Sequence, residues 1–147
     1  MRRIERIFIH CTAGNQEATV EDLTREFKQR GFKNPGYHYA VLPSGRIEQM
    51  LPEEEVSNGV QGYNSTSINV AYIGGIDGNG KAVDNRTEEQ KKSLVSLLKS
   101  LRERYPKAKI MGHRDISPDK NGNGIIDPWE GIKECPCFDA ITEYKDI

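Results

Sequence analysis

The sequence predicts a single α/β domain in which a mixed β-sheet of about five strands carries helices on both faces. Three observations favour this fold class. The chain has 147 residues, a length typical of one domain with one hydrophobic core. Two stretches with helical periodicity are interspersed with short apolar runs typical of strands. No repeat, low-complexity tract or linker divides the chain, so we expect residues 1–147 to form one unit.

Five short runs of apolar residues predict the strands of this sheet. Pro43-Ser44-Gly45 forms a turn between the second run and the third, which favours a hairpin. In chain order, the runs span residues 4–11, 37–42, 46–51, 68–73 and 108–112.

Alternation within the first strand assigns its side chains to two faces. Ile7, Ile9 and Cys11 share one face, whereas Phe8 and His10 share the other. We therefore expect Cys11 in the core. His10 falls near the carboxyl end of the strand, where open α/β sheets place their binding sites.

Two helices are predicted by capping boxes that precede helical periodicity. Thr19 and Asp22 open the first helix, and Thr87 and Gln90 open the second. The second helix has one apolar stripe, formed by Leu94, Leu97, Leu98, Leu101 and Tyr105.

The charge of the chain is nearly balanced, with 21 Lys and Arg, 22 Asp and Glu and a formal net charge of −1. This balance gives no electrostatic case for nucleic acid or an anionic membrane as a partner. No segment approaches the length of a transmembrane helix, and the apolar run 7–9 is too short for a signal peptide. We expect a monomer that is made in the cytoplasm without a signal peptide.

His10, His113 and a cysteine form a candidate metal site. A single histidine is more often a core or surface residue, but both of these follow predicted strands, whose ends meet if the strands are parallel neighbours. Two imidazoles and the thiolate of Cys135 suit zinc better than calcium or magnesium. Three protein ligands leave a fourth position open, as in catalytic zinc sites. Composition alone does not choose between Cys135 and Cys137.

Six motifs in order along nearly the whole chain resemble those of zinc-dependent N-acetylmuramoyl-L-alanine amidases of the type-2 amidase family. This family includes phage "lysozymes" that are amidases, and it shares its fold with peptidoglycan recognition proteins. The motifs are Ile9-His10-Cys11-Thr12-Ala13, Gly36-Tyr37-His38-Tyr39, Gly62-Tyr63-Asn64-Ser65-Thr66-Ser67-Ile68-Asn69-Val70, Ile73-Gly74-Gly75-Ile76-Asp77, Gly112-His113-Arg114-Asp115 and Lys133-Glu134-Cys135-Pro136-Cys137-Phe138-Asp139.

The resemblance implies a zinc ion on His10, His113 and Cys135, since Cys137 sits where relatives often have serine. It implies hydrolysis of the amide bond between N-acetylmuramic acid and L-alanine of peptidoglycan by a zinc-activated water. Bound zinc lowers the pKa of water to about 7.

The resemblance also implies catalytic roles for Tyr37 and Lys133. Lys133 would stabilise the oxyanion, an effect of about 3–4 kcal/mol for one donor. Tyr37 would orient the water or donate a hydrogen bond to the substrate. Without the resemblance, Tyr37 would be interpreted as a strand aromatic and Lys133 as a solvated lysine. His38 alternates away from Tyr37, which favours a packing or supporting role.

Some relatives carry a further histidine before the Gly62-Tyr63-Asn64 segment. This chain has Ser57-Asn58-Gly59 there, so we expect no functional histidine in that loop.

Residues 119–130 match the calcium-loop pattern D-x-[DN]-x-[DN]-G-x5-E at every defined position. The alternative is a Gly- and Asn-rich surface loop that matches by chance, and the flanking Pro118 and the internal Pro128 are unusual for such a site. We expect Ca²⁺ to rigidify the segment before Lys133 and Cys135. The expected ligands are Asp119, Asn121, Asn123, Ile125 through its carbonyl, Asp127 and Glu130.

The expected function is a cell-wall lytic enzyme of phage or mobile-element type that acts on peptidoglycan after release. One alternative is a peptidoglycan-binding module of the same fold without catalysis, but retention of Cys135, Tyr37 and Lys133 argues against it. A second alternative is a regulatory partner, because some phage amidases also bind a polymerase. No feature of this sequence identifies such a surface.

Overall fold

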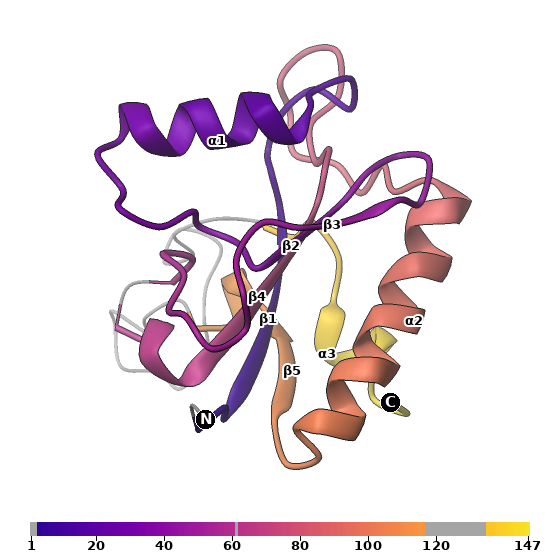
Figure 1. Cartoon of the computed structure of the whole chain (residues 1–147). Helices are drawn as coiled ribbons and strands as arrows, with labels where there is room; N and C mark the ends of the chain where they lie inside the picture. The colour runs from indigo at the N-terminus through magenta and orange to yellow at the C-terminus, as the bar shows by residue number, and fades with distance from the viewer. Residues whose placement is uncertain (1–2, 61, 117–134) are drawn as a thin grey trace, which may run out of the picture.

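The structure, a computed structural model, describes residues 3–60, 62–116 and 135–147. At its centre is a five-stranded sheet with the strand order β3-β2-β4-β1-β5 (Figure 1). The strands are β1 Arg6–Cys11, β2 Tyr39–Val41, β3 Ile47–Gln49, β4 Ser67–Tyr72 and β5 Lys109–Gly112.

Strand β1 lies between β4 and β5 and runs parallel to both. Strand β2 is also parallel to β4, whereas β3 pairs with β2 in the predicted antiparallel hairpin. The register places His10 beside Ala71 and Ile9 beside Gly112. Since parallel strands end at a common edge, the carboxyl ends of β1 and β5 lie next to each other.

Both long helices begin at the predicted capping boxes. The Thr19 hydroxyl accepts a hydrogen bond from the Asp22 backbone at 3.2 Å, and the Asp22 carboxylate accepts one from the Thr19 backbone at 2.9 Å. Thr87 and Gln90 make the equivalent bonds at 3.0 and 2.9 Å. The helices are α1 Val20–Gln29, α2 Glu88–Arg104 and α3 Ala140–Glu143, with 3₁₀ turns at Asn64–Thr66 and His113–Ile116.

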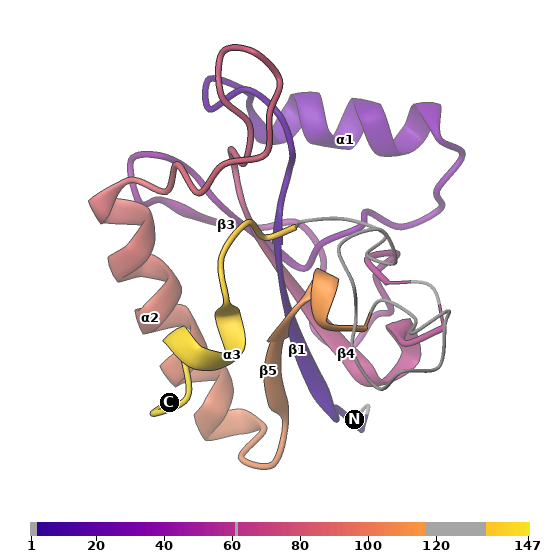
Figure 2. The same cartoon turned by 180° about the vertical axis from the view of Figure 1, so that it is seen from behind.

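Helices cover both faces of the sheet (Figures 1 and 2). Helices α2 and α3 pack on the face that carries Ile7, Ile9 and Cys11. Helix α1 packs on the opposite face through Leu23 and Phe27. The predicted fold class, a mixed sheet between helices, is therefore confirmed.

The structure differs from the prediction mainly at the ends of elements. Four of the five strands are shorter than predicted, and Tyr37 lies two residues before β2 instead of opening it. A side chain at Gly36 would lie 2.9 Å from the Phe27 ring, so the chain packs on α1 before it enters the sheet. Helix α3, capped by Asp139, was not predicted. Within the described residues, no helix has both the length and the apolar composition needed to cross a membrane.

Candidate active site

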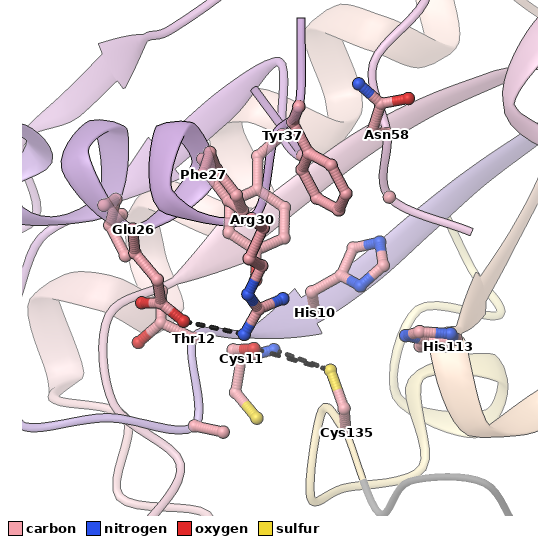
Figure 3. Close-up of a pocket in the computed structure, with 15 residues that line it drawn as sticks. His10, Cys11, Thr12, Glu26, Phe27, Arg30, Tyr37, Asn58, His113 and Cys135 are labelled. Atoms are coloured by element: carbon pink, nitrogen blue, oxygen red, sulfur yellow. Dashed lines mark hydrogen bonds and ion pairs between the residues drawn. The ribbon is translucent and has the colours of Figure 1, made fainter. Parts of the chain in front are cut away.

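Two histidines and a cysteine lie together at the carboxyl edge of the parallel strands. His10 is the penultimate residue of β1, and His113 follows β5 directly. With Cys135, they offer ligand atoms that all lie within 4.8 Å of one another. Figure 3 shows the three side chains around a common space. The fold thus brings together the three residues predicted as metal ligands.

Hydrogen bonds hold Cys135 beside β1. Its Sγ accepts a bond from the backbone N–H of Cys11 at 3.0 Å, and its carbonyl oxygen accepts one from the backbone of Arg114 at 2.9 Å. The carbonyl of the next residue, Pro136, accepts a bond from the buried Tyr72 hydroxyl at 2.7 Å. Strands β1 and β4 and the turn after β5 therefore all contribute to the position of this cysteine.

The other two cysteines contact each other and are not part of the His10, His113 and Cys135 cluster. Cys11 lies in the core, as predicted, with its Sγ 3.9 Å from that of Cys137. Cys137 in turn donates to the carbonyl of Gly75 at 3.5 Å. Hydrogen bonding to Cys135 and burial raise the pKa of the Cys11 thiol, which favours its neutral form. Among the described residues, the cluster with metal-ligand geometry contains Cys135 and not Cys137.

Tyr37 reaches this cluster from the segment before β2. The centroid of its ring lies 5.2 Å from that of His10 and 5.4 Å from that of Phe27. Burial, and then the nearby Cys135, raises the pKa of the Tyr37 hydroxyl. The hydroxyl therefore stays protonated at neutral pH and can donate a hydrogen bond.

Two parts of the predicted site lie outside the residues that the structure describes. One is Lys133, predicted to stabilise the oxyanion. The other is the predicted calcium loop over residues 119–130, with all six of its expected ligands.

A pocket of about 330 Å³ opens over the cluster and is lined by His10, His113 and Cys135. Pockets that bind small ligands usually have volumes of about 300–1,000 Å³. Helix α1 and its C-cap residue Arg30 contribute an ion pair to the wall of this pocket, in which Glu26 and Arg30 lie 2.7 Å apart (Figure 3). The sequence analysis did not single out this pair, because an ion pair at helical spacing is common on solvated helix faces.

His38 has a packing role, as predicted. Its side chain is fully buried, and its Nδ1 accepts a hydrogen bond from the backbone of Asn69 at 3.1 Å. Its Nε2 donates to the carbonyl of Glu55 at 2.8 Å. The ring thus joins β4 to the loop after β3 and is not part of the cluster of His10, His113 and Cys135.

Asn69 contacts the cluster and was missed by the sequence analysis. Its Oδ1 lies 2.7 Å from Nε2 of His10, and its Nδ2 donates to the Ser57 hydroxyl at 2.6 Å. A signal was present, because Asn69 is the one amide in the otherwise apolar run 68–73. A buried amide needs hydrogen-bond partners, so its position in a central strand points to a specific contact.

Residues 1–136 match the protein family described as N-acetylmuramoyl-L-alanine amidase. The chain belongs to this family. It is 35% identical over 140 residues to an endolysin of Enterobacteria phage K11, an alignment that covers 94% of this chain and 83% of the relative.

Solved structures agree with this assignment. The Ph2119 endolysin of a Thermus scotoductus bacteriophage superposes with a TM-score of 0.71 at 28% identity, covering 92% of this chain and 79% of that one. The N-acetylmuramoyl-L-alanine amidase LysC from Clostridium intestinale gives a TM-score of 0.75 at 24% identity, covering 97% and 82% of the two chains. This second likeness shows the shared fold.

The family and the endolysin relative identify the protein as an amidase that hydrolyses an amide bond of peptidoglycan. The alternative of a binding module without catalysis fits less well. In the described residues, His10, His113 and Cys135 lie together as a group that could hold a metal ion.

Proposed function

We propose that this amidase depends on zinc and that His10, His113 and Cys135 hold the metal. The observation that carries the proposal is that their ligand atoms lie within 4.8 Å of one another. Two imidazoles and one thiolate suit zinc, and a set of three protein ligands is typical of catalytic rather than structural sites.

The surroundings of Cys135 fit this role. A cysteine must be a thiolate to bind a metal, and the Cys11 backbone N–H, 3.0 Å from Sγ, stabilises negative charge there. The neighbouring Cys11 thiol favours its neutral form. Zinc bound to this set would supply an activated water with a pKa of about 7 and would polarise the substrate carbonyl.

The side chains around the cluster support the rest of the reaction. The amide between N-acetylmuramic acid and L-alanine would lie in the pocket over the cluster. Tyr37, held between Phe27 and His10, would donate a hydrogen bond to the carbonyl oxygen or to the departing amine. On the basis of the family resemblance, we assign to Lys133 the stabilisation of negative charge on that oxygen.

We also propose that the enzyme works as a monomer and acts on the cell wall after release from the cell that makes it. One chain supplies all three ligands and Tyr37, so the described site needs no second copy. The substrate places its action at the cell wall, and the endolysin relative supports release as the route.

Turnover on purified sacculi tests the proposal. Zinc-loaded wild-type protein should release new L-alanine N-termini, and Cys135→Ser should lose this activity. Cys137→Ser is the matched control and should retain it, because Cys137 is outside the cluster. No release by the zinc-loaded wild type would contradict the amidase activity, whereas full activity of the metal-free protein would contradict only the dependence on zinc.

A further inference from the structure

We propose that Asn69 is a positioning residue that orients His10 for the metal, an inference that rests on the proposed zinc site. Asn69 lies in β4, the parallel neighbour of β1, and the register pairs it with Phe8. Since side chains alternate along a strand, Asn69 shares the face of His10. Its Oδ1 is 2.7 Å from Nε2 of His10, and neither side chain is more than 2% exposed.

This contact determines which nitrogen of His10 carries the proton. In the orientation that the structure gives the Asn69 amide, its carbonyl oxygen faces His10 and can only accept a hydrogen bond, so Nε2 is the protonated nitrogen. In a neutral imidazole the other nitrogen, Nδ1, then carries the lone pair, and we assign Nδ1 as the ligand atom. Histidines that bind metals commonly donate their second N–H to an oxygen acceptor, which fixes both the tautomer and the ring orientation.

Asn69 is itself held in place through both its side chain and its backbone. Its Nδ2 donates to the Ser57 hydroxyl at 2.6 Å, and Ser57 is fully buried. Its backbone N–H donates to Nδ1 of His38 at 3.1 Å, and its backbone carbonyl accepts a bond from the His38 backbone at 2.8 Å. The amide therefore cannot rotate away from His10 without breaking a buried hydrogen bond.

Gly59 provides the space that the Asn69 amide occupies. A Cβ at position 59 would lie 2.4 Å from both Cγ and Oδ1 of Asn69. No side chain fits there while the amide holds its position, because real Cβ contacts are longer than this. Positions 59 and 69 are thus coupled through the contact that orients His10.

Zinc affinity, measured by competition with a chromophoric chelator, tests this role. Asn69→Leu should bind zinc about 10–100-fold more weakly than the wild type, the usual effect of losing such a partner. Asn69→Asp keeps an acceptor oxygen and should bind zinc more tightly than Asn69→Leu, with an affinity close to that of the wild type. Gln90→Leu is the matched control: Gln90 is another fully buried amide, bonded to the carbonyls of Val41 and Ile73, and its loss should leave zinc affinity unchanged.

The coupling with Gly59 gives a second, independent measurement. Gly59→Ala should displace the amide and weaken zinc binding by about as much as Asn69→Leu. In an Asn69→Gly background, Gly59→Ala should have little further effect, because no amide remains to be displaced. Additive losses in the double variant would contradict the proposed coupling.

Nitrogen-15 NMR of the zinc-loaded wild type tests the assignment without any variant that could fail to fold. Long-range ¹H–¹⁵N correlations should show the proton of His10 on Nε2. A proton on Nδ1, or wild-type zinc affinity in Asn69→Leu, would overturn the inference and leave the proposed zinc site intact. If the wild type itself binds no zinc, the proposed function fails instead.

Discussion

The backbone N–H of Cys11 lies 3.0 Å from the Sγ of Cys135, a residue 124 positions later in the chain. The preceding residue on β1, His10, supplies another of the proposed ligands. Two consecutive residues of one central, buried strand therefore contribute to the same proposed metal site, one through its side chain and the other through its backbone. Ile7, Phe8 and Ile9 of this strand are fully buried, so the strand gives the site a rigid base.

Removing the Tyr37 hydroxyl should slow turnover without changing metal binding. Loss of one hydrogen-bond donor to developing charge typically lowers kcat by about 10²–10³-fold, so we expect a decrease in this range for Tyr37→Phe. KM and zinc affinity should change little, because the ring still packs between Phe27 and His10. Steady-state kinetics on a soluble muropeptide checks this. Tyr39→Phe is the control, because the Tyr39 hydroxyl donates to Glu53. A wild-type kcat in Tyr37→Phe would exclude a catalytic role for the Tyr37 hydroxyl.

Arg86 should be important for stability because it ties the segment after Cys135 to the rest of the fold. Its side chain is only 2% exposed and bonds to Asp84 at 2.8 Å and to Glu143 at 2.5 Å. Its guanidinium also lies 3.4 Å from the centre of the Phe138 ring. Both carboxylates are partly exposed, so we expect Arg86→Met to lower the free energy of unfolding by about 2–3 kcal/mol.

Urea denaturation of Arg86→Met measures this change. Arg25→Met is the control, because Arg25 is 67% exposed in its ion pair with Asp22 and should contribute about 0–1 kcal/mol. Equal effects of the two substitutions would show that the Arg86 contacts contribute no more than a surface pair.

Glu53 should make stability depend on pH in the acid range. Burial raises the pKa of its carboxyl, but hydrogen bonds from Arg104, Tyr39 and Tyr105 outweigh burial and lower the pKa overall. A carboxyl with a lowered pKa in the folded state stabilises the protein above its unfolded pKa of about 4.3. This stabilisation is lost as the pH falls through the lower, folded value.

The measurement is the free energy of unfolding of the wild type and Glu53→Gln between about pH 3 and pH 7. The difference between the two proteins should be largest at neutral pH and should shrink below about pH 4.3. The same substitution at the exposed Glu54 is the control. A difference that is constant over the whole range would contradict the assigned cause.

The calcium loop over residues 119–130 stays a prediction from the sequence. If it binds Ca²⁺, EGTA should lower the melting temperature of zinc-loaded protein, and added Ca²⁺ should reverse the change. Asp119→Ala should remove the response to both reagents. The site would be excluded if EGTA left the melting temperature of the zinc-loaded wild type unchanged and Asp119→Ala melted at the same temperature as the wild type.

The fold was predictable because its signals are local. Alternation in residues 6–11 and the capping boxes at Thr19 and Thr87 each depend on a few neighbouring residues. The meeting of His10 with His113 also followed from the sequence, since it needs only that two strands are parallel neighbours. The choice of Cys135 over Cys137 came from the family resemblance.

The contacts that support the site were harder to predict. The pairing of Asn69 with His10 depends on the register between β1 and β4, and the need for Gly59 depends on a loop that returns over β4. Both are long-range relationships that no local pattern encodes. The late start of β2, two residues after Tyr37, has the same origin, because Gly36 packs against Phe27 of α1.

Zinc content tests the central claim most directly. Elemental analysis after dialysis at a fixed zinc concentration should find about one zinc ion per chain in the wild type and in Cys137→Ser. Cys135→Ser should retain far less, because it lacks the thiolate that completes the set with His10 and His113. A wild type without zinc, or a Cys135→Ser variant that holds as much as the wild type, would contradict the account.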